Sequence, residues 1–438
     1  MMRTAGHARG PSRGATADAA LAGLIAEHAQ PLPDIADAGF ADAFDAYADV
    51  DVVLIGDGTH GTSEFYRARA AITQRLVTQH GFRAVAIEAD WPDASTVNRY
   101  VQGDTPLDAA RPPFQRFPAW MWRNREMAAF VRWLREHNAG RPRDQRAGLY
   151  GLDIYSLDTS MAAVLAYLDR LDPDAAALAR SRYGCLSPWI AHPIRYGGAV
   201  LHGDYEGCAQ AVVAQCRDLL ERELSHAAEL DADFFDAAEN ARVVAAAEEY
   251  YRAAYLGSQE SWNLRDMHMA DTLDRIRRSH GATRKVVVWA HNSHVGDARA
   301  TDMAHHRGEL NIGQLCRQRY GLRCVSIGMG TYAGQVAAAD AWDQPMQVMD
   351  VRPALPDSHE HCMHGAGIER FLLDLRDDDD LRGELHQSRL ERFIGVIYLP
   401  QTERLSHYMR AELAGQFDAW VWLDRTSALQ PADDWPTV

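Results

Sequence analysis

Residues 52–69 read VVLIGDGTHGTSEFYRAR, and we expect the fold and the chemistry to be organised around this stretch. It begins with the apolar run VVLI, which is typical of a strand buried on both faces of a parallel sheet. Glycines then separate the polar residues Asp57, Thr59 and His60, at the point where the strand would end and a helix would begin. Ligands bind at this edge of parallel sheets, so these polar residues are candidates for a functional site.

The helix expected after this turn carries an arginine on its apolar face. Ala68, Ile72 and Leu76 recur at helical spacing, and Arg69 falls inside their stripe. A guanidinium does not lose its charge in a protein, so a core-facing arginine needs a carboxylate or a polar cavity. Asp57 is the nearest carboxylate in the sequence. Two interpretations remain open, a structural ion pair below an ordinary turn or one part of a functional site.

Length and charge limit the classes of partner. The chain has 438 residues, enough for one large domain or for two or three average ones, and its formal net charge is -16. A phosphate backbone or an anionic membrane surface would favour a basic protein face, so we expect neither nucleic acid nor a membrane as a partner. No apolar run approaches the length of a membrane span. A small molecule is the expected partner, and the sequence does not indicate an oligomeric state.

The cysteines and the first residues indicate a cytoplasmic protein. The six cysteines form no CxxC pair and no dense framework, so we expect reduced thiols. The first 20 residues are basic and rich in small side chains, but they lack the apolar core of a secretory signal. We therefore interpret residues 1–18 as a mobile arm and expect a cytoplasmic location.

The spacing of apolar runs predicts an α/β fold with a mostly parallel central sheet flanked by helices. Runs that resemble the first strand occur at residues 84–87, 149–152, 286–290, 324–328, 394–399 and 420–423. Their uneven spacing favours an open or irregular sheet over a closed (β/α)8 barrel. We expect residues 19–438 to form one α/β domain with a largely helical insertion at about 156–284, which contains long helices at 208–230 and 234–255.

Polar residues directly follow most of these strands. Because the carboxyl ends of parallel strands meet at one edge of a sheet, we expect the polar residues to share one crevice. The residues concerned are Asp57, His60, Glu88, Asp90, Asp153, His291 and His294. Histidines beside carboxylates are suited to acid–base chemistry near neutral pH.

The last helix of the insertion begins near Ser261 and repeats the pattern seen at Arg69. Asp266 falls within an apolar stripe of this helix, and Arg265 lies on its flank. Charges directed toward a packed face indicate a polar site, and we count Asp266 as a candidate substrate contact. A salt bridge within or between helices is the alternative.

An aromatic segment, FPAWMWRN at residues 117–124, lies before the insertion. Trp120, Trp122, Arg123 and Asn124 would suit the wall of a pocket for a bulky, mostly apolar ligand, so they are candidate substrate contacts. The alternative is that the segment forms ordinary core packing.

Several common catalytic motifs are missing. The sequence contains no GxSxG, GxxxxGK[ST] or HExxH motif, and no GxGxxG follows the first strand. A serine hydrolase of the usual α/β type, a P-loop nucleotidase and a dinucleotide enzyme are therefore disfavoured. The remaining candidate groups are histidines, carboxylates and arginines.

These groups are suited to hydrolysis by activated water. Asp57, three positions before His60, can orient the imidazole and make it more basic, and Glu88 can hold His60 or share its proton. His60 can then take a proton from water. Two histidines and two arginines remain to polarise a carbonyl and to stabilise its oxyanion, namely His291, His294, Arg69 and Arg265.

A metal site is the competing interpretation. His291 and His294, with Asp57, His60 and Glu88, offer nitrogen and oxygen ligands suited to zinc or iron. No tight ligand motif is present, so we favour a site without a metal or other cofactor. The alternative functions are a metal-dependent hydrolase with another substrate and a non-catalytic protein that binds a small molecule.

Six ordered motifs resemble those of the erythromycin esterase family. The motifs are GDGTHGTSEFYRAR, AIEADWP, FPAWMWRN, GLDIYSLDTSM, SWNLRDMHMADTL and VVVWAHNSHVGDARAT, and they span nearly the whole chain after the first residues. The family also includes succinoglycan-biosynthesis-like and uncharacterised relatives. The resemblance implies an α/β core with helical additions and a metal-independent hydrolase that opens the macrolactone ester of macrolide antibiotics, an activity that gives macrolide resistance.

The resemblance also implies roles for single residues. His60 matches the general-base histidine of the family, Arg69 the arginine that follows it, and Glu88 the acidic residue of the second strand. The remaining matches are His291 and His294 of the WAHNSH motif and Arg265 of the SWNLRD motif. One residue departs from the family pattern, because Asp57 stands where the usual residue is a glutamate, which is one methylene longer.

Overall fold

The computed structural model describes residues 13–190, 192–225, 232–279, 285–376, 379–432 and 435. Most of the predicted arm, residues 1–18, lies outside these ranges. Helix α1 (Arg13–His28) begins inside the predicted arm, and the carboxylate of Asp18 accepts a hydrogen bond from Arg389 at 2.7 Å. Residues 13–18 are therefore part of an ordered helix rather than of an arm.

An open sheet of eight strands forms the centre of the molecule, in the order β1-β9-β12-β6-β2-β5-β3-β4. The strands are β1 (Gln30–Pro31), β2 (Val52–Ile55), β3 (Ala84–Asp90), β4 (Gly148–Asp153), β5 (Val286–Trp289), β6 (Cys324–Gly330), β9 (Arg370–Asp374) and β12 (Ala419–Leu423). The pairs from β12 to β4 are parallel, and β9 is antiparallel to both of its neighbours. This sheet confirms the predicted mostly parallel α/β core.

Helices cover both faces of the sheet because alternate strand residues point in opposite directions. Val53 and Ile55 pack with one set of helices, α2 (Ser63–Gln79), α3 (Trp91–Val101) and α5 (Arg125–Asn138). Val52 and Leu54 pack with a second set, α1, α11 (Ser258–Arg278) and α14 (Ile312–Tyr320). All four residues of β2 are fully buried, which explains the continuous apolar run in the sequence.

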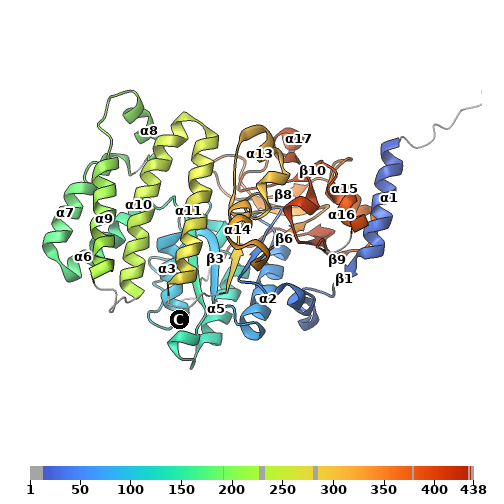
Figure 1. The fold of residues 1–438 in the computed structure, drawn as a ribbon, viewed down its shortest axis with the longest axis horizontal. Helices are drawn as coiled ribbons and strands as arrows, with labels where there is room; N and C mark the ends of the chain where they lie inside the picture. Colours follow the sequence, from blue (N-terminus) through green and yellow to red (C-terminus); the bar gives the residue numbers. More distant parts are fainter. Residues whose placement is uncertain are drawn as a thin grey trace, which may run out of the picture.

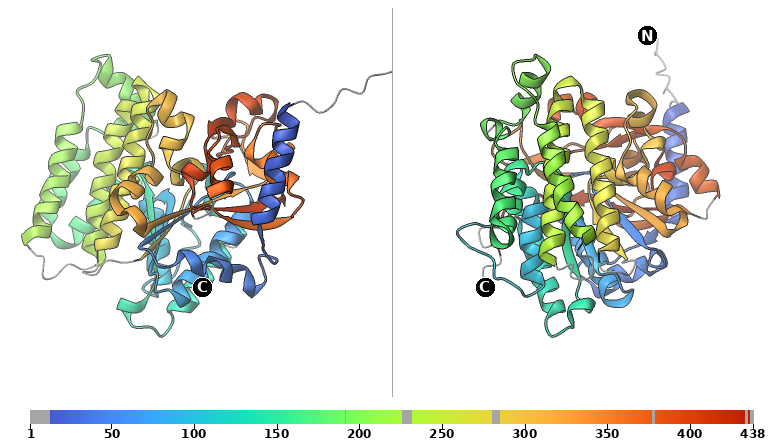
Figure 2. Two further views of the ribbon diagram at one scale, coloured as in Figure 1. Left: turned by 45° about the vertical axis from the view of Figure 1, so that its right-hand side comes forward. Right: turned by 60° about the vertical axis from the view of Figure 1, so that its left-hand side comes forward.

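The predicted insertion contains a lobe of helices at one side of the sheet, shown in green in Figure 1. Its helices are α6 (Leu157–Leu171), α7 (Pro173–Tyr183), α8 (Ile194–Leu201), α9 (Ala209–Ser225) and α10 (Ala232–Leu256). They bury an apolar core of their own, and α11 lies between this lobe and the sheet (Figure 2). Helices α9 and α10 confirm the two long helices expected at 208–230 and 234–255, of which residues 226–230 lie outside the described ranges.

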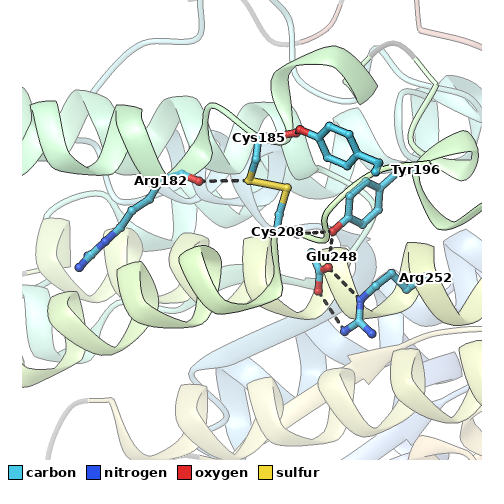
Figure 3. Close-up of a disulfide and its surroundings, with 7 residues drawn as sticks. Arg182, Cys185, Tyr196, Cys208, Glu248 and Arg252 are labelled. Carbon is cyan, nitrogen blue, oxygen red and sulfur yellow. Dashed lines mark hydrogen bonds and ion pairs between the residues drawn. A yellow bond between two sulfur atoms is a disulfide. The ribbon is translucent and has the colours of Figure 1, made fainter. Parts of the chain in front are cut away.

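A disulfide joins Cys185 and Cys208 inside the helical lobe, so the prediction of six reduced thiols is wrong for this pair (Figure 3). Their Cα atoms are 5.9 Å apart, within the range that a disulfide spans. The hydroxyl of Tyr196 accepts a hydrogen bond from the Cys208 N–H and donates one to Glu248 of α10. Cys185 follows α7 and Cys208 precedes α9, so the pairing depends on how these two helices pack together, which cysteine spacing does not reveal. The other four cysteines are free thiols.

One predicted strand is wrong. Residues 394–399 form no strand of the main sheet, and Ile394 and Ile397 make only isolated bridges to Thr59 and Ala339. This segment lies beside the loop after β2, while β9, which the apolar pattern missed, pairs with β12. Smaller sheets are formed by β7 (Ala333–Ala338), β8 (Gln347–Val351) and β13 (Arg425–Thr426), and by β10 (Arg389–Arg392) and β11 (Tyr408–Ala411).

Short helices complete the fold between these strands. They are α4 (Ala119–Trp122), α12 (Asn292–Val295), α13 (Asp302–Arg307), α15 (His359–Gly365), α16 (Asp379–Leu385), α17 (Glu403–Ser406) and α18 (Leu413–Gln416), and a 3-10 helix spans Ala38–Tyr47. In the part of the chain that the structure describes, no helix has both the length and the apolar character that crossing a membrane requires.

Candidate active site

The neighbouring strands β2, β5, β3 and β4 end beside one another and present their following polar residues at the same edge. The predicted residues that meet there are Asp57, His60, Arg69, Glu88, Arg265, His291 and His294. Asp153 and Asp266 join them. The expected convergence of strand ends is therefore present.

Asp57 and Arg69 form a buried ion pair below the turn. Arg69 Nη2 lies 2.7 Å from Asp57 Oδ2, and the two side chains are 1 % and 0 % exposed. The guanidinium also lies over the rings of Tyr66 and Trp289, at 4.4 and 5.4 Å. Burial raises the pKa of Asp57, but Arg69 and the neighbouring His60 together outweigh this effect and keep the pKa below its usual value. Although Asp57 is one methylene shorter than the glutamate that the resemblance implies at this position, its carboxylate reaches Arg69.

His60 lies between two carboxylates without a short contact to either. Its Nδ1 is 3.4 Å from Asp57 Oδ1, and its Nε2 is 3.9 Å from Glu88 Oε1. The backbone fixes the turn, because the His60 N–H donates to the carbonyl of Ile394 at 3.0 Å. Gly61 is required next to it, since a Cβ there would lie 1.8 Å from the carbonyl oxygen of Ala337.

Glu88 contacts three other residues of the cluster, Arg265, His294 and His291. Its Oε1 accepts a hydrogen bond from Arg265 Nη2 at 2.8 Å and lies 3.3 Å from His294 Nε2. Its Oε2 accepts the backbone N–H of His291 at 2.9 Å. Burial raises the pKa of Glu88, but the neighbouring side chains, first His294 and then His60 and Arg265, hold the pKa well below the usual range. Glu88 is thus an ionised carboxylate.

His294 is held tightly in its charged form. Its Nδ1 lies 2.9 Å from Asp266 Oδ1, and its ring stacks on Trp262 with centroids 4.5 Å apart. Burial opposes the charged ring, but Asp266 and Glu88 raise the pKa of His294 to about 10. Asp266 is fully buried and also accepts the backbone N–H of Ile312 at 3.0 Å. It therefore orients His294, and its contact with substrate stays a prediction.

His291 is the neutral histidine of the site. Burial and the nearby His60 lower the pKa of His291 to about 3. Its Nδ1 lies 2.8 Å from Ser293 Oγ, and its ring centroid is 4.7 Å from that of His60. Within the described residues, His291 Nε2 has no hydrogen-bond partner.

The chain can now be compared with known proteins. The model of the erythromycin esterase family matches residues 77–426, which is most of the chain. The chain belongs to the erythromycin esterase family. Among curated proteins, the erythromycin esterase type II of Escherichia coli is 21 % identical over 401 residues, covering 86 % of this chain and 90 % of that protein.

Solved structures show the same fold. A crystal structure of a Bacillus cereus protein has a TM-score of 0.80 at 20 % identity and covers 95 % of this chain and 99 % of that one. A succinoglycan biosynthesis protein has a TM-score of 0.78 at 20 % identity, with coverage of 97 % and 100 %. An open conformation of a mutant of the erythromycin esterase EreC has a TM-score of 0.66 at 16 % identity, covering 90 % and 95 %.

Parts of the FPAWMWRN motif have structural roles in this member of the erythromycin esterase family. Trp120 and Trp122 are buried in the core below the sheet, and the Trp122 indole donates to the backbone oxygen of Glu88 at 2.8 Å. Asn124 caps α5, since its side chain accepts the N–H of Met127 at 2.7 Å. These contacts fit the core alternative, and contact of these three residues with substrate stays a prediction.

Arg123, at the end of α4, makes no hydrogen bond or ion pair with the histidine–carboxylate cluster in the described part of the chain. The same ranges contain no group of three or more His, Cys, Asp and Glu side chains arranged to hold a metal ion.

Arg265 has two further partners, Asp153, which was expected in the shared crevice but was given no role, and Tyr155, which was not predicted. Asp153 binds it with two hydrogen bonds, and the Tyr155 ring lies 5.0 Å from its guanidinium carbon. The position of Asp153 at a strand end was a usable signal, because Glu88 and His291 occupy equivalent places. No pattern in the sequence indicates the role of Tyr155.

Proposed function

We propose that this member of the erythromycin esterase family is a hydrolase that cleaves a carboxylic ester or macrolactone by direct attack of water, with His60 as the general base. The observation that carries the proposal is the unequal setting of two histidines around Glu88. His60 lies 3.9 Å from Glu88, whereas His294 is held between Glu88 and Asp266. We assign the exchange of a proton to His60 and the stabilisation of negative charge to His294.

The first step is activation of water. Asp57 faces Nδ1 of His60, so the Nδ1–H points toward a carboxylate and Nε2 carries the lone pair. The distance between His60 Nε2 and Glu88 Oε1 exceeds a direct hydrogen bond, and a water molecule placed there would contact both groups. Loss of its proton to His60 would leave a hydroxide equivalent ready to attack the ester carbonyl.

The second step is stabilisation of the tetrahedral intermediate. Its oxyanion would face the guanidinium of Arg265 and the imidazolium of His294, which are preorganised positive charges. The intermediate then collapses, the bond from the acyl carbon to the alkoxy oxygen breaks, and protonated His60 returns its proton to that oxygen. The products are an alcohol and a carboxylic acid, joined in one molecule when the substrate is a lactone.

The substrate class rests on relatives. Family members named as erythromycin esterases support a macrolactone of the erythromycin type, and hydrolysis of such a compound would give macrolide resistance. Hydrolysis by this route needs no metal ion, because Asp57, Glu88 and Asp266 are each already paired with an arginine or a histidine. We accordingly expect a small-molecule substrate and no cofactor.

The test is a turnover assay on macrolides of different ring size and on simple aryl esters, with product masses checked for addition of water. His60→Ala should lower kcat/KM by about 10²- to 10⁴-fold, the usual contribution of a general base. His305→Ala, which removes an exposed histidine of α13, is the matched control and should act as wild type. Dialysis against a chelator should leave the rate unchanged.

Two results would overturn the proposal. If wild-type protein turns over no lactone or ester above the His60→Ala background, the chain is not an ester hydrolase. If His60→Ala retains wild-type turnover of an ester that the parent cleaves, the base is another group.

A further inference from the structure

Asp153 makes the most complete contact with Arg265 in the site. Arg265 Nε donates to Asp153 Oδ1 at 2.8 Å, and Nη2 donates to Oδ2 at 2.6 Å. Asp153 is 4 % exposed, and its Oδ1 also accepts the backbone N–H of Ile154 at 2.9 Å. A carboxylate held by its own backbone and bound to the guanidinium at two points fixes the plane of that guanidinium.

The remaining contacts of Arg265 complete this restraint. Nη2 also donates to Glu88 at 2.8 Å, and Nη1 lies 3.1 Å from His294 Nε2. The ring of Tyr155 lies 5.0 Å from the guanidinium carbon, so one face of the group is covered. The edge that carries Nη1 is therefore directed at His294.

The sheet is locally distorted where these carboxylates meet. Strand β3 pairs with β4 through Ile87 opposite Gly151 and Asp90 opposite Asp153, so β3 has one residue more than β4 between these pairs. A bulge of this kind re-aims side chains at the end of a strand. Gly151 permits it, because a Cβ there would lie 2.6 Å from the carbonyl oxygen of Ala89. Glu88 and Asp153 thereby reach the same guanidinium from adjacent strands.

The contact between Arg265 and His294 has an electrostatic requirement. Two cationic side chains in contact repel each other unless carboxylates surround them. Glu88 contacts both groups, Asp266 pairs with His294, and Asp153 pairs with Arg265. Without Asp153, Arg265 would depend on Glu88 alone and would compete with His294 for it.

We infer that Asp153 is a positioning residue of the active site, which neutralises Arg265 and fixes its orientation so that Arg265 and His294 together face the developing oxyanion. The inference rests on the proposed function for its catalytic meaning. Its alternative is a purely structural ion pair, which would stabilise the fold without affecting the chemical step.

A double-mutant cycle separates the two roles. Asp153→Asn keeps the size of the side chain and should lower kcat by about ten- to a hundredfold with a smaller change in KM, because a misplaced catalytic group mainly affects the transition state. In an Arg265→Ala background the same change should have little further effect on kcat. Asp169→Asn removes the partner of Arg180 in an Arg–Asp pair within the helical lobe, and as the control it should leave kcat unchanged.

A second variant tests the contact between Asp153 and Arg265 in case Asp153→Asn does not fold. Arg265→Lys keeps the positive charge but cannot form two parallel hydrogen bonds with Asp153, so its kcat should fall in the same way. Thermal melts of all variants establish that the measured proteins are folded.

A spectroscopic readout tests the inference without turnover. The groups that face His294 are Glu88, Asp266 and Arg265, with Trp262 on its ring face. In Asp153→Asn, Arg265 keeps its charge while one neighbouring negative charge is lost, so the titration midpoint of His294 in NMR spectra should fall below that of wild type. Asp169→Asn should leave the midpoint unchanged.

The outcomes are distinguishable. An unchanged His294 midpoint in Asp153→Asn, or additive losses of kcat in the cycle, would overturn the inference. If wild-type protein cleaves no ester, the proposed function fails, and the titration of His294 still decides whether Asp153 controls this pair.

Discussion

Two histidines, His60 and His294, lie on either side of Glu88. Each lies beside an aspartate as well, but His294 is held closely by its two carboxylates and His60 is not. His60, on the turn after β2, has carboxylate oxygens at 3.4 and 3.9 Å. His294, on α12, has them at 2.9 and 3.3 Å and is stacked on Trp262. Close, well-oriented carboxylates stabilise a charged ring, whereas longer separations leave space for a water molecule between the ring and the carboxylate.

This difference indicates different catalytic roles for His60 and His294. A general base must release its proton again in every cycle, so a histidine locked in its charged form cannot serve as one. A group that stabilises an oxyanion should instead carry its charge throughout the reaction. The loosely held histidine fits the first role and the locked histidine fits the second.

The largest expected effect is a loss of stability when the negative charge of Asp57, which supports the turn that carries His60, is removed. Asp57→Asn would leave Arg69 buried without its carboxylate, and breaking a buried pair in this way typically costs about 3–5 kcal/mol of unfolding free energy. Chemical denaturation of both proteins measures the loss. Asp169→Asn, which breaks an exposed pair, should change stability little. Equal stability of Asp57→Asn and wild type would show that Asp57 does not support Arg69.

A smaller effect is expected on the His294 side. Asp266→Asn removes one of the two carboxylates that raise the pKa of His294 to about 10 against the opposing effect of burial. The alkaline limb of the kcat/KM profile should therefore move to lower pH, and kcat at neutral pH should fall by about tenfold or more, because orientation of the ring is lost. A profile with the same alkaline limb as wild type would contradict the assigned role of Asp266.

His294 also makes the stability of the folded protein depend on pH. His294 has a pKa of about 10 in the folded protein and an ordinary value of 6.5, so the folded state binds its proton more tightly. Its contribution to stability is complete below pH 6.5 and is lost as the pH rises toward 10. In Asp266→Asn this loss should end at a lower pH, which denaturation curves across this range would detect.

The smallest effect should follow from the stacking partner. Trp262→Phe keeps an aromatic face against His294 and should change kcat by less than about threefold, since one ring contact is worth only about 0.5–1.5 kcal/mol. Trp262→Ala removes the face altogether and should have the larger effect. Identical rates for the two variants would show that the stacked ring does not restrain His294.

The sequence was most informative where chemistry follows a buried strand. Glycines and polar residues after apolar runs located Asp57, His60, Glu88, His291 and His294, because parallel strands bring such positions together whatever the intervening chain. Arg69 and Asp266 were identified because a charge on an apolar stripe requires a partner, and Arg265 because it lies on the flank of the same stripe as Asp266. Both arguments use only local patterns.

The remaining features depend on contacts between distant segments. Asp266 orients His294 because the start of α14 supplies the N–H of Ile312, and nothing near residue 266 indicates this. The aromatic segment at 117–124 supports the core because α4 packs under the sheet, although its composition suits a pocket wall equally well. The place of β9 in the sheet likewise depends on its pairing with β12.

The central claim is that the two histidines beside Glu88 have different roles. Its most direct test is the protonation of the histidine rings at pH 8, measured by ¹⁵N–¹H NMR. Signals would be assigned with His294→Gln and His291→Gln. The carboxylates of Asp266 and Glu88 predict, against the effect of burial, that His294 carries protons on both ring nitrogens at this pH, while burial and the adjacent His60 keep His291 neutral. A neutral His294 ring at pH 8 would contradict the account.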